Sequence, residues 1–235
     1  EMALRIAERG INVILTYHLN KEKAEELVAQ IQKKGTKAIA YLLDTSRIDT
    51  FDDFFNQVAE HLKEKTGHSK FDYLINNAGI GNNIPFDKTT EAQFDELTNI
   101  QFKGVFFFIQ KALKYLNDGG SIINVSSGLT RFVGPGYAVY ASTKAAIENL
   151  TRYLAKELSD REIRVNVIAP GAIATDFAGG QVRDNKQYNN YISSVTALGR
   201  VGVAEDIGGV VAFLCSRDAA WINGQRIEVS GVINL

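Results

Sequence analysis

The sequence predicts an α/β fold in which a parallel sheet carries helices on both faces. Short apolar segments alternate with longer amphipathic ones along the whole chain, and this alternation is typical of βαβ units. No linker and no repeat of fixed period interrupts it. The 235 residues, 45% of them hydrophobic and 23% charged, are enough for one domain with one core.

The first half of the chain is expected to form three strands and two helices. The helix at 21–34 places apolar side chains at the i, i+3, i+4 and i+7 spacing of one helical face, and Gly35 follows it as a left-handed cap. The strands are expected at 12–17, 37–43 and 71–76, and the second helix at 51–65.

The second half begins with a long helix over about 91–116. Thr90 and Gln93 form a capping box at its start, and Gly119 and Gly120 are expected to stop it. Residues 175–202 are polar and glycine-rich; we expect a substrate lid there, with a solvent-exposed excursion as the alternative. The remaining strands are expected at 121–126, 163–169 and 225–229, and the remaining helices at 138–158 and 205–215.

Composition excludes several classes of function. A net charge of −1 gives no general attraction to nucleic acid or to an anionic membrane surface. The longest apolar run, at 105–109, is far shorter than the ~18 residues that span a bilayer. Cys215 is the only cysteine, which excludes an intrachain disulfide and a Cys-based zinc site. We expect a cytoplasmic protein without a metal site, and one that binds neither nucleic acid nor membrane.

The ends of the predicted strands indicate where a ligand binds. In an open parallel sheet, the ligand lies beyond the carboxyl ends of the strands. Five strands end in residues that could line one crevice there: Tyr17-His18, Asp44-Thr45, Asn76-Asn77-Ala78-Gly79, Ser126-Ser127 and Pro170-Gly171.

Tyr140 and Lys144 lie four residues apart on a predicted helix and therefore share a face. A phenol has a reference pKa of ~10, and a nearby ammonium lowers it, which would make the tyrosine a usable acid–base near neutral pH. The pair alone is weak support, because Tyr17 and Lys21 have the same spacing. A pair exposed on the helix surface is the alternative.

Ser127 strengthens the catalytic interpretation. It ends a predicted strand thirteen residues before Tyr140, and a turn-rich loop separates the two. A serine hydroxyl and a tyrosine that meet at the crevice suit carbonyl reduction, in which negative charge develops on the carbonyl oxygen. They suit a serine nucleophile poorly, because no histidine and no Gly-x-Ser-x-Gly elbow accompany Ser127.

Five motifs in this order and spacing resemble the short-chain dehydrogenase/reductase family. The resemblance runs from residue 1 to about Gly231 and implies a single Rossmann-type domain over 1–235, with a doubly wound sheet in three α/β/α layers. The motifs are Asn76-Asn77-Ala78-Gly79, Ser127, Tyr140-Ala-Ser-Thr-Lys144, Arg164-Val-Asn-Val-Ile-Ala-Pro170-Gly171 and Thr175.

The resemblance implies a role for each matched position. Ser127 would polarise the carbonyl, Tyr140 would be the acid–base, and Lys144 would lower the tyrosine pKa and hold the ribose. Ser126 is expected to be structural, and Asn76 and Asn166 are expected either to bridge strand ends or to contact the ligand. The remaining cofactor contacts would come from the backbone of Asn77, Ala78 and Gly79, from Asp44 and Thr45 at the adenine, and from Pro170, Gly171, Ile173 and Thr175 at the nicotinamide.

The chain departs from the family pattern in two places. The family opens with a strand and a Thr-Gly-x-x-x-Gly-Ile-Gly turn, whereas residues 1–10 match the helix after that turn. We expect the first strand and the turn to be missing from an incomplete sequence, because their loss would expose two strand edges. Second, Gln101 stands where many members have a catalytic asparagine, and its longer amide could still hold a proton-relay water.

In the family that the chain resembles, the residues at the end of the second strand indicate whether the cofactor is NAD or NADP. An acidic residue there favours NAD, because it binds the ribose 2′-hydroxyl and repels a 2′-phosphate. This chain has Tyr17-His18-Leu19-Asn20-Lys21 and no carboxylate before Glu22. We therefore expect NADP(H), with Tyr17, His18 and Lys21 at the cofactor. The alternative is that Lys21 only begins a solvated helix face.

The leading prediction is an NADP-dependent oxidoreductase that interconverts a small-molecule ketone and a secondary alcohol. One alternative is a non-catalytic dinucleotide sensor or scaffold on the same fold. The other is a 3-oxoacyl-thioester reductase, with Arg183, Lys186 and Arg200 meeting an acidic carrier.

The resemblance also implies a homotetramer or homodimer, since family members commonly form homotetramers through the long helices and the C-terminal strand. The helix at 105–109 is apolar nearly all round and the end at 232–235 is apolar, which fits such contacts; ordinary core within one chain is the alternative. The substrate pocket is expected from 82–86, 129–137 and the lid. Ile84, Phe86, Phe132 and Phe177 indicate a partly apolar substrate.

Overall fold

Six strands form the centre of residues 1–234, the part of the chain that the computed structural model describes. Every strand pairing is parallel. The strands form two groups of paired neighbours: β1 (Val13–Tyr17) with β2 (Ala38–Leu42), and β3 (Phe71–Asn76), β4 (Leu116–Val125), β5 (Arg164–Pro170) and β6 (Arg226–Val229) in that order.

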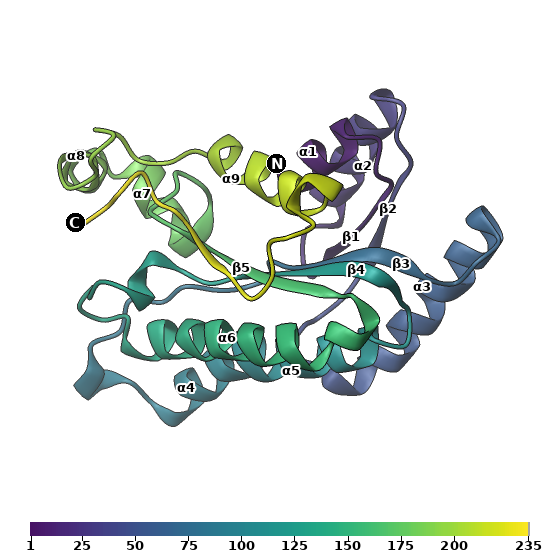
Figure 1. Ribbon diagram of the computed structural model, residues 1–235. Helices are drawn as coiled ribbons and strands as arrows, with labels where there is room; N and C mark the ends of the chain where they lie inside the picture. Colours follow the sequence, from purple (N-terminus) through teal and green to yellow (C-terminus); the bar gives the residue numbers. More distant parts are fainter. Residues whose placement is uncertain (235) are drawn as a thin grey trace.

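Helices cover both faces of the strands, so the molecule has three layers (Figure 1). This is the doubly wound, Rossmann-type arrangement that the alternation of elements predicts. One face carries α3 (Phe51–Thr66), α4 (Glu91–Thr98), α5 (Gly104–Ala112) and α6 (Ala138–Glu157), and the other carries α1 (Met2–Glu8), α2 (Lys21–Lys33) and α9 (Ala204–Leu214).

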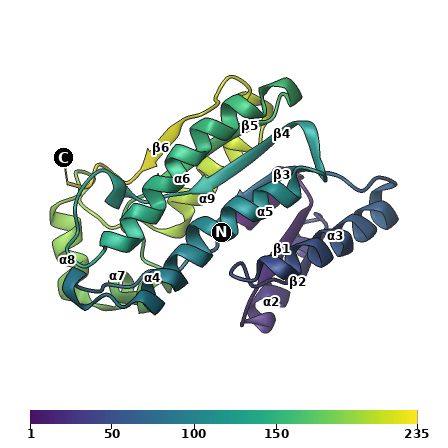
Figure 2. The same cartoon turned by 90° about the horizontal axis from the view of Figure 1, so that it is seen from below.

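An apolar core joins the two groups of strands. Phe55, Phe108 and Leu116 belong to a buried cluster between the second group and its helices. Ile14 of β1 and Tyr41 of β2 pack against the same cluster, although neither strand is paired with β3 in the described residues (Figure 2). Burial of apolar surface therefore holds the sheet together where ladder hydrogen bonds do not.

The prediction of one continuous helix over 91–116 is wrong in two respects. The capping box of Thr90 and Gln93 is confirmed, but a π-helical turn at Asn99–Lys103 separates α4 from α5. The helix then ends at Ala112, because Leu116 already pairs with Phe71 in the sheet. The two glycines expected to stop the helix lie inside β4 instead.

The segment 175–202 is more regular than the sequence predicts. It contains α7 (Gln181–Asp184) and α8 (Lys186–Ser194), the second capped by the Asn185 side chain. Bridges of Ile173 with Gly202 and of Thr196 with Ile233 tie the segment to the body of the protein. None of the helices in residues 1–234 is both long and apolar enough to cross a membrane.

Candidate active site

Tyr140 and Lys144 lie where the parallel strands end, as their place in the sequence predicts. Both project from the first turns of α6, which packs against β4 and β5. Ser127 follows the end of β4 and begins a short turn, in which its Oγ accepts a hydrogen bond from the Leu129 amide at 3.2 Å. Tyr140, Lys144 and Ser127 are 7%, 5% and 9% exposed, so the structure excludes a surface-pair interpretation.

Lys144 is held close to Tyr140 without a direct hydrogen bond between them. Its Nζ donates to the Val125 carbonyl at 2.9 Å and lies 5.8 Å from the centre of the Tyr140 ring. Burial lowers the pKa of Lys144 to about 8, because the charged ammonium is desolvated. A buried ammonium with one hydrogen-bond acceptor among residues 1–234 retains donors for a ligand.

The pKa of Tyr140 differs from the sequence-based prediction. Burial raises the pKa of Tyr140 to about 12, and the neighbouring Ser127 hydroxyl offsets only part of that change. The Lys144 Nζ donates to the Val125 carbonyl and makes no hydrogen bond to the phenol in residues 1–234. The phenol is therefore fully protonated at neutral pH, which is the form that can donate a proton.

Gln101 lies beside the same residues, at the π-helical turn. Its side chain is completely buried, and neither Oε1 nor Nε2 has a hydrogen-bond partner in the described residues. A Cβ added to Gly79 would lie 3.1 Å from Gln101 Oε1 and 3.5 Å from Lys144 Nζ. The glycine thus leaves a cradle lined by an amide and an ammonium, and buried unpaired amides of this kind indicate a bound water or ligand.

The candidates for adenosine recognition meet at the ends of β1 and β2. His18 Nε2 lies 3.6 Å from Asp44 Oδ2, and Asp44 Oδ1 accepts hydrogen bonds from the Ser46 amide and hydroxyl. Burial opposes ionisation of Asp44, but the Ser46 hydrogen bonds and His18 hold its pKa below the ordinary value. Tyr17 ends β1, and Lys21 begins α2 with its side chain exposed.

Three further cofactor candidates, Thr45, Asn77 and Ala78, follow the ends of β2 and β3. The Thr45 carbonyl lies 2.1 Å from the position of a Cβ on Gly104, so the end of β2 is pressed against α5. Asn77 and Ala78 follow β3 and are exposed, with backbone accessible to a ligand.

The candidates after β5 have structural partners of their own. Pro170 ends β5, and the Gly171 amide donates to the Val229 carbonyl at 3.0 Å. A Cβ on Gly171 would lie 2.8 Å from the Ser230 Cα, so the close packing of Gly171 against the residue after β6 leaves no room for a side chain.

Ile173 and Thr175 lead from β5 into the segment 175–202. Ile173 forms a bridge with Gly202, and Thr175 Oγ1 accepts a hydrogen bond from the Phe177 amide at 3.3 Å. These contacts fix the chain beside the crevice. They also direct Phe177 to the site, where its ring centre lies 6.0 Å from that of Tyr140.

The residues present fit a dinucleotide along the strand ends. Basic and polar groups stand at the β1 end, the Gly79 cradle and Lys144 lie in the middle, and Thr175 lies at the β5 end. A Cβ at position 79 would fill the cradle, and the buried ammonium is a ready partner for ribose hydroxyls.

A cavity of about 400 Å³ reaches Tyr137, the aromatic neighbour of Tyr140, but Tyr140 itself is not part of its lining. The Tyr137 ring, which lines it, lies 6.1 Å from the Tyr140 ring. Of the four residues expected to make the pocket partly apolar, Ile84 is in its lining and the other three are not: Phe86 is 84% exposed, Phe132 packs on Gly128, and Phe177 packs near Tyr140. The lining consists of Gly81, Asn82, Asn83, Ile84, Gln93, Tyr137, Ala178, Gly179 and Gln181.

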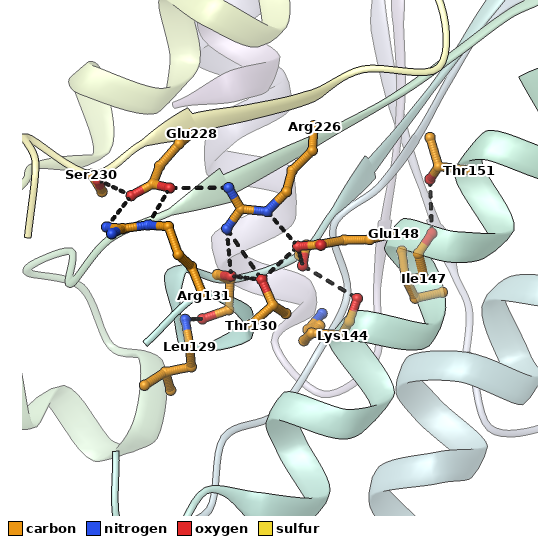
Figure 3. Close-up of polar contacts among 12 residues, drawn as sticks. Leu129, Thr130, Arg131, Lys144, Ile147, Glu148, Thr151, Arg226, Glu228 and Ser230 are labelled. Atoms are coloured by element: carbon orange, nitrogen blue, oxygen red, sulfur yellow. Dashed lines mark hydrogen bonds and ion pairs between the residues drawn. The ribbon is translucent and has the colours of Figure 1, made fainter. Parts of the chain in front are cut away.

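An ionic network that was not predicted from the sequence joins Glu148, Arg226 and Glu228 (Figure 3). One carboxylate oxygen of Glu148 accepts hydrogen bonds from Ser126 Oγ at 2.7 Å, Thr130 Oγ1 at 2.7 Å and Arg226 Nε at 2.8 Å. Arg226 Nη2 also reaches the Ser127 carbonyl at 3.4 Å. Glu148 thus ties both ends of the Ser127 turn to α6, and its position four residues after Lys144 is the signal that could have identified it.

The network continues toward the end of the described chain. Arg226 and Arg131 both donate to the carboxylate of Glu228, as does the Ser230 hydroxyl. Burial opposes ionisation of Glu228, but these hydrogen bonds hold its pKa at about 2. Arg131 also donates to the Ile233 carbonyl at 2.7 Å, so the chain end is fastened to the same network.

The structural residues near the strand ends have their polar groups engaged. Asn76 Nδ2 donates to Asn124 Oδ1 at 2.8 Å, and Asn124 donates to the Thr151 hydroxyl. Asn166 bridges the Ile222 carbonyl and the Gln225 amide. Within residues 1–234, no group of His, Cys, Asp and Glu side chains is suited to hold a metal ion.

Known proteins resemble this chain over nearly its whole length. A family model described as enoyl-(acyl carrier protein) reductase matches residues 1–232. The hydroxynaphthalene reductase-like protein Arp2 of Metarhizium brunneum is 34% identical, over 98% of this chain and 88% of its own length.

Two solved structures share the fold closely. The promiscuous reductase LugOII, which catalyses keto-reduction at C1 during lugdunomycin biosynthesis, matches with a TM-score of 0.93 and 36% identity, over 100% of this chain and 92% of its own. The angucycline C-6 ketoreductase LanV with bound NADP matches with a TM-score of 0.91 and 34% identity, over 98% and 90%. The chain is therefore an oxidoreductase that belongs to the short-chain dehydrogenase/reductase family.

Proposed function

We propose that the protein is an NADPH-dependent ketoreductase that converts a ketone to a secondary alcohol at Tyr140. One observation carries the proposal: Ser127, Tyr140 and Lys144 are all buried together where β4 and β5 end. The Tyr140 ring lies 6.1 Å from that of Tyr137, which lines the cavity, so the phenol is placed to give its proton to a substrate oxygen that gains one on reduction.

The proposed chemistry divides between cofactor and protein. The nicotinamide, when bound, supplies the hydride that the carbonyl carbon gains. Tyr140 transfers its hydroxyl proton to the carbonyl oxygen, and the Ser127 hydroxyl donates a hydrogen bond to that oxygen as negative charge develops on it. The products are the alcohol, the oxidised cofactor and a tyrosinate, which must then regain a proton.

Lys144 and Gln101 support this proton transfer. The Lys144 ammonium, 5.8 Å from the Tyr140 ring, stabilises the tyrosinate by charge and is placed to bind ribose hydroxyls. The unpaired amide of Gln101 lies against the same cradle as Lys144 and is suited to hold a water that returns the proton.

The preference for NADPH rests on the exposed end of β1. Lys21 and His18 are cationic or polar groups there, and the sequence has no carboxylate before Glu22 to repel a 2′-phosphate. Crystal structures of two similar proteins, LanV and a blue fluorescent protein from a metagenomic library, contain NADP and NADPH. Tyr17, Asp44 and Thr45 would form the adenosine end of the site.

The names of the relatives indicate the ketones to test. The similar proteins are called hydroxynaphthalene reductase-like and angucycline ketoreductase, and one LanV structure contains rabelomycin. We therefore propose a ketone attached to an aromatic ring system. Support for an acyl-carrier substrate is weak, because Arg183 pairs with Asp176 and Asp184 and is not free for an acidic carrier.

We also propose a homotetramer or homodimer. Part of the apolar run at 105–109 is ordinary core, since Phe108 and Ile109 are buried, but Phe106 is 40% exposed and Tyr153 on α6 is 61% exposed. At the chain end Ile233 is buried and Val232 is 44% exposed, while residue 235 lies outside the described residues. Light scattering coupled to size-exclusion chromatography tests this proposal, and a mass near 25.9 kDa would contradict it.

Consumption of NADPH with a fused-ring ketone tests the proposed activity. We expect 1-tetralone or a hydroxylated tetralone to oxidise NADPH, followed by the loss of absorbance of the reduced nicotinamide. With NADH as the cofactor, kcat/KM should be at least about tenfold lower, because NADH lacks the 2′-phosphate and loses one charge-assisted hydrogen bond, which is worth about a factor of ten. Equal use of both cofactors would contradict the 2′-phosphate site, and binding of neither would contradict the proposed function.

A further inference from the structure

The cavity beside Tyr140 has an unusual lining. Four of its nine residues carry carboxamide side chains and one carries a phenol: Asn82, Asn83, Gln93, Gln181 and Tyr137. None of the nine is Lys, Arg, His, Asp or Glu. The cavity therefore presents many neutral hydrogen-bond donors and acceptors and no formal charge.

Local hydrogen bonds fix two of these amides and leave capacity for a ligand. Asn83 Nδ2 donates to the Pro135 carbonyl at 2.9 Å, and Gln93 Oε1 accepts from the Thr90 amide at 3.0 Å. Each of these amides keeps its other polar atom available. Asn82 and Gln181 make no side-chain hydrogen bond to any of residues 1–234, so both ends of their amides can bind a ligand.

Aromatic rings flank the passage from this cavity to the reacting group. The Tyr137 and Phe177 rings lie 6.1 Å and 6.0 Å from the Tyr140 ring, and the Phe177 ring occupies the space above Gly81, where a Cβ would lie 2.4 Å from its Cζ. Flat apolar faces next to the proton donor suit a planar ring, while the cavity that holds the four amides does not include Tyr140 in its lining.

We propose that the cavity binds the part of the substrate remote from the reacting ketone, and that this part is uncharged and carries oxygen substituents such as phenols or a second carbonyl. Gln181 and Asn82 are then the specificity-determining residues. This inference rests on the proposed ketoreductase function and names its substrate class. Amides in a site reject an analogue without oxygen substituents, because they would be desolvated without partners.

The same lining disfavours an anionic substrate. A carboxylate or phosphate in the cavity would lose its hydration and gain no cation, since the residues that line it carry none.

Gln181 lies outside the sheet: it begins α7 directly after Gly179 and Gly180, which both have left-handed φ values. Its amide is therefore contributed by the segment 175–202 and not by the sheet.

Three ligands with one skeleton test the proposal: 1-tetralone, a tetralone with a hydroxyl on the ring remote from the ketone, and its carboxylated counterpart. Calorimetry with the NADP⁺-saturated protein gives Kd for each ligand, and NADPH oxidation gives kcat/KM. For the wild type we expect the hydroxylated ligand to be favoured over tetralone by about tenfold or more, and the carboxylate to be disfavoured by a similar factor.

Variants identify the residues responsible. Gln181→Leu and Asn82→Leu should reduce the preference for the hydroxylated ligand to about threefold or less, in Kd and in kcat/KM. Gln187→Leu is the matched control, because Gln187 is an exposed glutamine of α8 outside the cavity. It should retain the wild-type preference.

The outcomes separate this inference from the proposed function. If no tetralone oxidises NADPH, the ketoreductase proposal is refuted, and the ratio of the calorimetric Kd values still decides the cavity proposal. Equal Kd values for tetralone and its hydroxylated form, or tighter binding of the carboxylate, would overturn the assignment of an uncharged, oxygenated substrate. An unchanged preference in both variants would overturn the roles of Gln181 and Asn82.

Discussion

Replacement of Lys144 by methionine should stabilise the protein near neutral pH. Lys144 is 5% exposed, and burial lowers its pKa from 10.5 to about 8. Because both the folded and the unfolded chain bind the proton below pH 8, the folded state carries the full desolvation cost there. At about 1.4 kcal/mol per pH unit, that cost is ~3 kcal/mol. Methionine keeps most of the side-chain volume and removes the charge.

The net gain is smaller than the desolvation cost. Lys144 donates a hydrogen bond to the Val125 carbonyl at 2.9 Å, and its loss costs about 1–2 kcal/mol. We therefore expect Lys144→Met to raise the free energy of unfolding by about 1–2 kcal/mol at pH 7. Urea unfolding without added nucleotide measures this difference.

The pH dependence isolates the charge. As pH rises from about 8 toward 10.5, the folded protein releases the Lys144 proton before the unfolded chain does, so the cost disappears from the wild type. The advantage of the variant over the wild type should therefore shrink by about 2 kcal/mol between pH 7 and pH 9.5. If the difference in free energy of unfolding between variant and wild type does not change with pH, or if the variant is less stable than the wild type at pH 7, the desolvated Lys144 ammonium does not destabilise the fold and the reasoning is refuted.

Three further predictions concern the supports of the site. Glu148→Ala should lower the free energy of unfolding by about 2–3 kcal/mol, because Glu148 accepts three hydrogen bonds beneath the Ser127 turn. Thermal unfolding measures this loss, and the control variant Glu148→Gln should retain most of the stability. Gly104→Ala would place a Cβ 2.1 Å from the Thr45 carbonyl and should cost about 2–3 kcal/mol in urea unfolding, whereas Gly209→Ala, with open space around it, should be neutral or stabilising. Lys21→Ala should raise KM for NADPH about tenfold and leave KM for NADH unchanged in steady-state kinetics, and a parallel rise for NADH would contradict the 2′-phosphate contact.

Local patterns predicted the parts of the fold that local physics determines. The capping box of Thr90 and Gln93 and the left-handed Gly35 after α2 appear as predicted, because both depend on residues a few positions apart. The boundary between α5 and β4 was mispredicted, because pairing of Leu116 with Phe71 decides it, and that contact joins distant parts of the chain.

The site shows the same division. The four-residue spacing of Tyr140 and Lys144 places them on one face of α6 and near each other. The direction of the Tyr140 pKa change could not be predicted from that spacing, because burial by surrounding elements dominates it. Likewise Arg226 reaches Glu148 from 78 residues away, and no periodicity in the sequence links these two positions.

Turnover by Tyr140→Phe tests the central claim most directly. The substitution removes only the phenolic oxygen from a ring that is already buried, and Tyr137→Phe is the matched control on the neighbouring ring. With NADPH and a tetralone, we expect kcat of Tyr140→Phe to fall by about 10³-fold or more, while Kd for NADPH, from fluorescence titration, stays within about threefold. If Tyr140→Phe keeps more than about a tenth of the wild-type kcat, Tyr140 is not the proton donor and the proposed mechanism is wrong.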